Sequence, residues 1–69
     1  MLVLKNTVRE CRSIKHINQQ QLADATGTTR ETINRLERGT YQSPNYRLLY
    51  DIALFFEKPI EEIFFYVEE

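Results

Sequence analysis

The chain has 69 residues, of which 42% are hydrophobic and 28% charged, with a formal net charge of -1. This length fits one domain that buries about 60% of its unfolded surface, so its core must be compact and helix-rich. One cysteine excludes an internal disulfide, and one cysteine with one histidine cannot supply the ligands of a zinc site. No apolar run approaches a membrane helix or a signal-peptide core, so we expect a cytoplasmic protein.

The small net charge conceals a strong asymmetry along the chain. Residues 1–47 carry eight Lys and Arg against four Asp and Glu, a net +4. Residues 48–69 carry one lysine against six acidic residues, a net -5. The split favours a basic half that faces phosphate and an acidic half that faces away, although a mixed solvated surface would give the same count.

The only glycines, Gly27 and Gly39, and the only prolines, Pro44 and Pro59, divide the chain into five helix-sized pieces. The first predicted helix spans about Lys5–His16. Its inward face is predicted to carry Val8, Cys11, Arg12 and Ile14. Cys11 is then better explained as a small buried side chain than as a nucleophile.

The second and third predicted helices are short and close together. Asn18 and Gln21 form a capping-box pattern at the start of a helix over Gln19–Thr26, and Gly27 suits the left-handed conformation that ends it. Thr29 caps the next helix. That helix, Arg30–Arg38, buries Ile33 and Leu36 and leaves Arg30, Glu31, Asn34 and Arg35 on its outer face.

Asn45 is predicted to cap a fourth helix that extends to about Glu57. Its inward stripe consists of Tyr46, Leu49, Ile52, Ala53 and Phe56. Leu48, Leu54 and Phe55 lie outside that stripe, and this apolar surplus predicts a second buried face. Pro59 begins a last short helix, and Phe65–Val67 reads as extended chain.

Two short helices joined across a glycine turn can place the second helix in a DNA major groove about 12 Å wide. Taken alone, this arrangement is also common in all-helical proteins. The residues are more specific, because Gln19–Ala23 and Gly27–Gly39 resemble the Cro/CI-like (XRE) family of helix-turn-helix regulators. Pro59–Phe64 also looks like the fifth-helix ending of small single-domain members, so the resemblance covers nearly the whole chain.

The resemblance implies a mainly α, five-helix domain of the lambda-repressor type over residues 1–69, with the helix-turn-helix at 18–39. Gln19 matches the glutamine whose side chain and backbone amide hold a DNA phosphate in this family. The other positions that match backbone contacts are Asn18, Thr29, Arg38, Thr40, Tyr41 and Gln42. These contacts should set register without reading sequence.

Base reading is expected from the first two turns of the third helix. Arg30 or Arg35 can bond guanine, and Asn34 can pair with adenine if it reaches that far. Thr32 can offer its methyl group to thymine, although a local capping role explains it equally well. Glu31 departs from the glutamine of many relatives, and either accepts from cytosine, orients Arg35 or is a solvated residue.

Arg12 and Glu37 match a family pair that joins the first helix to the end of the third. Removal of one partner from a buried pair of this kind typically costs about 3 to 5 kcal/mol. We therefore interpret Arg12 as structural rather than as a phosphate ligand.

Family members commonly bind palindromic DNA as dimers, because one module buries only about 600 to 1,000 Å² on DNA. We expect a dimerisation region at about residues 46–67, with an interface that includes Leu48, Phe55, Ile60 and Phe64. The alternative is that these residues only complete a small core. The end segments Leu2–Leu4 and Phe65–Val67 are expected to pair as a two-stranded antiparallel sheet.

The leading interpretation is thus a transcriptional repressor that binds double-stranded DNA as a homodimer. An antitoxin-type protein that docks another protein on its acidic half is the alternative. An enzyme is the weakest interpretation, because His16 has no acid or nucleophile placed around it by sequence. We expect no cofactor, metal, membrane association or small-molecule ligand.

Overall fold

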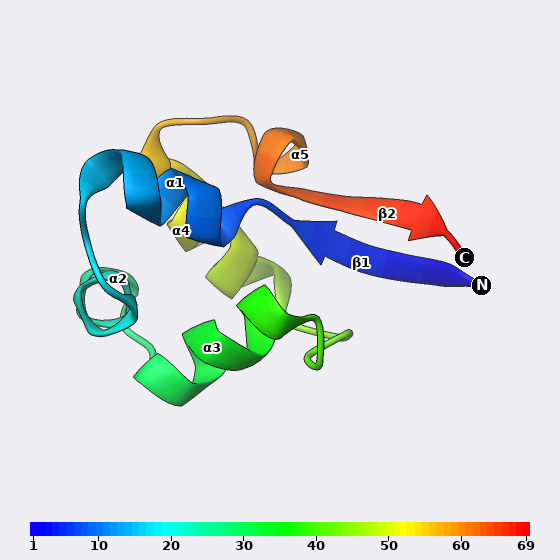
Figure 1. Cartoon of the computed structure of the whole chain (residues 1–69), viewed down its shortest axis with the longest axis horizontal. Coiled ribbons are helices and arrows are strands. Elements are labelled where there is room, and N and C mark those ends of the chain that lie inside the picture. The colour runs from blue at the N-terminus through cyan, green and yellow to red at the C-terminus, as the bar shows by residue number, and fades with distance from the viewer.

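A computed structural model describes the whole chain, residues 1–69, as five helices and a two-stranded antiparallel sheet (Figure 1). In chain order the elements are β1 (Leu2–Asn6), α1 (Val8–Lys15), α2 (Gln19–Thr26), α3 (Arg30–Arg38), α4 (Tyr46–Phe56), α5 (Ile60–Ile63) and β2 (Phe64–Glu68). The predicted fold class and the predicted pairing of the chain ends are confirmed. None of the helices has both the length and the apolar character needed to cross a membrane.

Side-chain caps set the starts of three helices. Asn18, Thr29 and Asn45 each accept a hydrogen bond from a backbone N–H in the first turn of α2, α3 and α4. Such caps satisfy donors that have no partner inside the helix. The bounds of α2 and α3 are those predicted from the sequence, because the signals that set them are local.

Helix α1 starts later than predicted, at Val8 rather than at about Lys5. Lys5 and Asn6 pair with β2 instead, as the last residues of β1. The Oδ1 atom of Asn6 accepts from the Val8 N–H at 3.1 Å, and its Nδ2 donates to the Leu36 carbonyl at 2.7 Å. This asparagine therefore links the strand, the start of α1 and the end of α3.

One apolar core joins all the helices to the near end of the sheet. Its buried members are Leu4, Val8, Cys11, Leu22, Ala23, Ile33, Leu36, Ile52, Ala53, Phe56, Ile63 and Phe64. Every element contributes at least one of these side chains. The two helices of the helix-turn-helix are consequently held at a fixed angle by packing rather than by the turn alone.

Two residues that were predicted to face inward are exposed. The exposed fraction of Ile14 is 74%, because it follows Val8 by six residues and so lies off the inward face of α1. Tyr46 is 67% exposed and stacks on Tyr50, with 6.1 Å between ring centroids. Tyr46 therefore belongs to an outer apolar surface of α4.

The sheet extends away from the helices as a narrow ribbon that carries both termini at its far end (Figure 1). Leu4 lies opposite Tyr66, and Leu2 lies opposite Glu68. The near end is anchored by Leu4 and Phe64 in the core, whereas Leu2 and Tyr66 are more than half exposed. A two-stranded ribbon alone is marginal in water, so its stability depends on this anchor.

Candidate nucleic-acid interface

The turn between α2 and α3 is built around Gly27. Its φ of 73° lies in the left-handed region, which glycine adopts without steric cost. The N–H groups of Gly27 and Thr28 both donate to the Ala23 carbonyl, which closes the end of α2. Thr29 then caps α3 after only two intervening residues. The chain therefore reverses sharply enough to lay α3 across α2.

The outer face of α3 carries the residues that were predicted to read bases. Arg30, Glu31 and Arg35 are exposed, and Asn34 is half-buried beside α2. The hydroxyl of Thr32 lies 2.9 Å from that of Thr29, whose Oγ1 also accepts the Thr32 N–H at 3.2 Å. Thr32 thus takes part in the local cap, one of the two roles considered for it.

Arg35 is held by the loop that follows α3. Its guanidinium lies over the ring of Tyr41, 5.1 Å from the centroid, and the Thr40 hydroxyl donates to the Arg35 carbonyl at 3.3 Å. Glu31 forms no ion pair with Arg35, its neighbour four residues later. Tyr41, and not Glu31, therefore orients this arginine in the structure.

Arg12 and Glu37 join α1 to α3 through two hydrogen bonds of 2.6 and 3.0 Å. The exposed fractions of their side chains are 15% and 1%. The hydrogen bond to Glu37 raises the pKa of Arg12 above its ordinary value, although partial burial acts in the opposite direction. Arg12 also donates to the Ile17 carbonyl at 3.1 Å, so the guanidinium also fixes the chain that leads into α2.

The Gln19 side chain is turned toward α3. Its Nε2 donates to Glu37 Oε1 at 3.0 Å and to Asn34 Oδ1 at 3.3 Å. These two bonds use both N–H groups of the amide, so the side chain has no donor left for the phosphate predicted there. The backbone N–H of Gln19 stays free at the start of α2, where the helix dipole favours an anion.

The Gln42 side chain was predicted to contact the DNA backbone, but it is bound within the chain. Its Oε1 accepts from the Leu4 N–H at 2.9 Å, and its Nε2 donates to the carbonyls of Leu4 and Gly39 at 3.2 and 2.9 Å. The free edge of β1 offers this N–H and C=O pair, which a glutamine amide matches in the way a neighbouring strand would. Gln42 therefore fastens the loop after α3 to the sheet.

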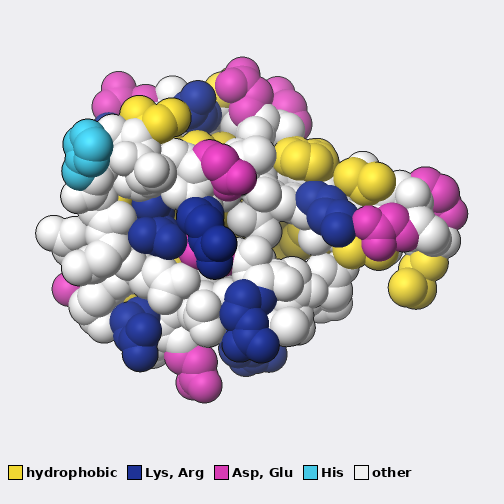
Figure 2. Space-filling view, in the orientation of Figure 1, with side chains coloured by type: hydrophobic (Ala, Val, Ile, Leu, Met, Phe, Trp, Pro, Cys, Tyr) yellow, Lys and Arg dark blue, Asp and Glu magenta, His cyan; other side chains and the backbone are white.

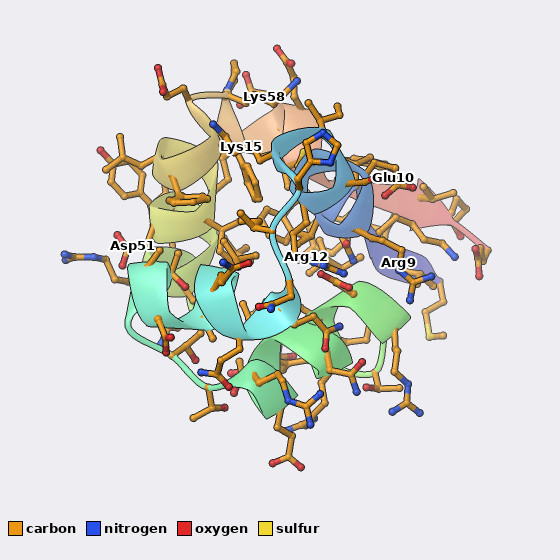
Figure 3. All side chains as sticks on the ribbon, turned by 60° about the vertical axis from the view of Figure 1, so that its left-hand side comes forward. Arg9, Glu10, Arg12, Lys15, Asp51 and Lys58 are labelled. Carbon is orange, nitrogen blue, oxygen red and sulfur yellow. The ribbon has the colours of Figure 1, made fainter.

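Arg9 lies beside Glu37 in this region, although it was not among the predicted site residues. Its side chain is 71% exposed, and its Nε lies 3.9 Å from Glu37 Oε1. Figure 3 shows Arg9 and Arg12 on neighbouring turns of α1. The signal was present in the sequence, because residues three apart share a helix face.

Charge is divided over the molecule as the sequence predicted. In Figure 2, Lys and Arg side chains gather over α1 and α3, whereas most Asp and Glu side chains lie near α5 and at the tip of the sheet. Lys5, at the near end of that ribbon, is paired with Glu69 at 2.9 Å. The cationic side chains thus lie on α1 and α3, whereas α2 carries no Lys or Arg.

The residues predicted for the dimer interface differ in exposure. Phe64 is only 6% exposed and packs in the core of its own chain, so it is not available to a partner. Leu48, Phe55 and Ile60 are half-buried against the same core. The large apolar side chains that remain exposed in this half are Tyr46, Tyr50, Leu54, Phe65, Tyr66 and Val67.

A four-residue spacing identifies three of these exposed residues, Tyr46, Tyr50 and Leu54, as one stripe along α4.

The single cysteine and the single histidine of the chain lie in different surroundings. Cys11 is buried, and His16 is exposed at the left-handed end of α1. No group of three or more His, Cys, Asp or Glu side chains lies close enough to hold a metal ion.

A pair of short helices across a glycine turn, with a polar, cationic outer face on the second helix, defines a helix-turn-helix DNA-binding protein. Comparison with known proteins agrees with this class. The helix-turn-helix family model matches residues 8–63, from α1 through α5. The chain therefore belongs to the XRE-type helix-turn-helix family, which confirms the resemblance found in the sequence.

Curated relatives are similar over almost their full length. An uncharacterized HTH-type transcriptional regulator of Methanocaldococcus jannaschii is 36% identical over 96% of this chain and 98% of its own. One from Archaeoglobus fulgidus is 39% identical over 96% of this chain and 92% of its own. YgzD of Bacillus subtilis is 33% identical over 96% of this chain and 98% of its own. The family and these relatives identify the chain as a DNA-binding transcriptional regulator.

Proposed function

We propose that this protein is a sequence-specific transcriptional repressor that binds a palindromic operator as a homodimer. Residues 1–69 act as one DNA-binding domain with its helix-turn-helix at 18–39. The observation that carries the proposal is the outer face of α3, where Arg30, Glu31 and Arg35 are all exposed. Repression requires only that the dimer occupy promoter DNA, and it needs no cofactor or small-molecule ligand.

Base recognition is assigned to Arg30, Arg35 and Asn34, with Glu31 beside them. Either arginine can donate two hydrogen bonds to guanine O6 and N7. Arg35 is the stronger candidate, because the Tyr41 ring limits its conformations before DNA binds. Thr32 contributes through its cap to the shape of the first turn and, through its methyl group, to contact with thymine.

Phosphate contacts are assigned to the two ends of the motif. The free backbone N–H of Gln19 and the exposed Asn18 lie at the start of α2, and Thr29 lies at the start of α3. Arg38, Thr40 and Tyr41 follow at the end of α3, on a loop that Gln42 fastens to β1. Arg9 extends this phosphate surface along α1.

The dimer is assigned to the region of about residues 46–67. An unpartnered apolar stripe on α4 and the exposed far end of the ribbon support this assignment, together with half-buried Leu48, Phe55 and Ile60. A two-fold axis in this region would set recognition helices one DNA turn apart, about 34 to 36 Å. Two modules bound to one operator then reach together an affinity that one module rarely reaches alone.

An antitoxin-type partner is the second candidate, favoured by the exposed acidic residues of the C-terminal half. Glu57, Glu61, Glu62, Glu68 and Glu69 are all exposed. A cationic protein could bind this surface while the opposite side holds DNA. Co-purification of one stable partner at equal stoichiometry would favour this candidate over repression by the homodimer alone.

A mobility-shift titration against the DNA upstream of the protein's own reading frame, at two salt concentrations, tests the proposal. Specific binding should weaken as salt rises, with a slope of about -0.9 for each phosphate neutralised. A protein that bound neither this DNA nor any sequence from a randomised duplex library would refute the proposed function.

A further inference from the structure

Hydrogen bonds link Arg12 on α1, through Glu37 and Gln19, to the outer face of α3. Which group donates and which accepts in each of these bonds is fixed. Glu37 is a carboxylate that only accepts, and Arg12 occupies both of its oxygens as a donor. Gln19 adds a third donor at Glu37 Oε1. The carboxylate therefore forces the Gln19 amide to turn its Nε2, and not its Oε1, toward α3.

The orientation of the Gln19 amide in turn fixes the orientation of the Asn34 amide. The second N–H of Gln19 Nε2 requires an acceptor, and Asn34 supplies it with Oδ1 at 3.3 Å. Asn34 Nδ2 then points away from Gln19. It makes no hydrogen bond within the chain, and no buried side-chain atom of the protein lacks a partner, so Nδ2 is open to solvent.

We propose that Gln19 and Glu37 are positioning residues that orient the Asn34 amide so that it presents only its Nδ2 donors to the DNA. This inference rests on the proposed DNA-binding function and names how one base is selected. An edge that offers acceptors alone fits such a donor, and guanine, with O6 and N7 in the major groove, fits it best. Cytosine, which presents a donor there, fits it worst.

This orientation changes the base expected at Asn34. Adenine is read by an asparagine that donates to N7 and accepts from N6 at once, which requires Oδ1 to face the base. Gln19 holds that oxygen on the protein side. Guanine therefore replaces the adenine that the sequence alone suggested for this residue.

The test begins with a randomised duplex library selected on the wild-type protein. The resulting consensus supplies a duplex and its three single-base variants at every position. Asn34→Asp keeps the shape of the side chain and still accepts from Gln19, but presents an acceptor to DNA. It should lose the guanine preference at one position and favour cytosine there, a change of about 5- to 150-fold in relative affinity.

Variants of Gln19 and Glu37 test whether these two residues orient the Asn34 amide or only stabilise the fold. Gln19→Ala frees the Asn34 amide to rotate, so discrimination between guanine and adenine should fall at that one position and persist elsewhere. The exchange Gln19→Glu with Glu37→Gln keeps one carboxylate and one amide but reverses the donors. It should turn Asn34 Oδ1 outward and shift the preference toward a base that donates.

The matched control is Gln20→Ala, which removes a neighbouring amide that bonds only to Asp24 on the exposed side of α2. Its base preferences should equal those of the wild type. Thermal unfolding of each variant accompanies the binding data, and if the exchange variant does not fold, Asn34→Asp and Gln19→Ala decide the matter.

The outcomes distinguish this inference from the function on which it rests. A wild-type protein that selects no sequence contradicts the proposed function itself. A wild-type protein that selects a clear consensus, while Asn34→Asp leaves every base preference unchanged, overturns only the orientation of Asn34. Equal losses on all sequences for Gln19→Ala would assign Gln19 to phosphate binding or to stability instead.

Discussion

Glu37 lies near the end of α3, and Arg12 reaches it from α1 with two hydrogen bonds of 2.6 and 3.0 Å. The carboxylate is 1% exposed, so its charge is almost fully removed from water. A buried ion pair adds little net stability against an apolar pair, but an unpaired buried charge is costly. The pair therefore acts as a constraint on where α1 meets α3.

Glu37→Ala should lower the free energy of unfolding by about 3 to 5 kcal/mol, because it leaves the Arg12 guanidinium without its carboxylate. Urea denaturation followed by circular dichroism measures this loss. The double variant Arg12→Met with Glu37→Leu removes both charges and should recover most of it. A double variant as unstable as the single one would contradict the view that the unpaired charge is the cause.

Gln42→Ala should destabilise the protein by about 1 to 3 kcal/mol, since it leaves the backbone N–H and C=O of Leu4 without their partner. The loss should also be local. Amide hydrogen exchange at Leu4 should become faster than in the wild type, whereas exchange in α2 should follow only the change in global stability. Ser43→Ala, in the same loop but without such bonds, is the control.

Local signals were sufficient for most of the helix bounds. Asn18, Thr29 and Asn45 each accept from a backbone N–H three residues later, and Gly27 and Gly39 act through their own backbone angles. Such effects are visible in a short window of sequence.

What the sequence could not predict depends on residues that are far apart in the chain. Lys5 and Asn6 suit a helix start locally, yet pairing with β2 makes them strand. Gln42 and Gln19 match family positions for phosphate contact, but Gln42 bonds to Leu4, 38 residues away in the sequence, and Gln19 bonds to residues 15 and 18 away. No local pattern encodes such distances, and the donor direction at Asn34 follows only from them.

The proposed dimer predicts that a charge placed on the exposed apolar surface of residues 46–67 prevents association. Leu54→Glu or Tyr66→Glu should convert a dimer to a monomer in sedimentation velocity, because a buried carboxylate without a partner is unfavourable. Binding to a full palindrome should fall while binding to an isolated half-site stays nearly constant.

Ile14→Glu provides a matched control for that experiment, because Ile14 is an apolar residue on α1 that is even more exposed, at 74%, than Leu54 and Tyr66, at 62% and 63%. Its variant should remain dimeric. A wild-type protein that sediments as a monomer at concentrations where it binds the palindrome would contradict the proposed dimer, as would variants of Leu54 and Tyr66 that still associate.

Arg35→Ala should weaken DNA binding in a sequence-dependent way, by about 1 to 3 kcal/mol on duplexes that carry its guanine and far less on others. Arg35→Lys keeps the charge but loses the planar fork, so it should retain the salt dependence and lose the base preference. Tyr41→Phe preserves the ring beneath the guanidinium, so it should keep the base preference of the wild type and lose only the phosphate contact of the hydroxyl, equally on all duplexes, whereas Tyr41→Leu should also weaken the base preference. Titrations of matched duplexes measure all four variants, and equal losses for Arg35→Ala on every sequence would make Arg35 a phosphate contact.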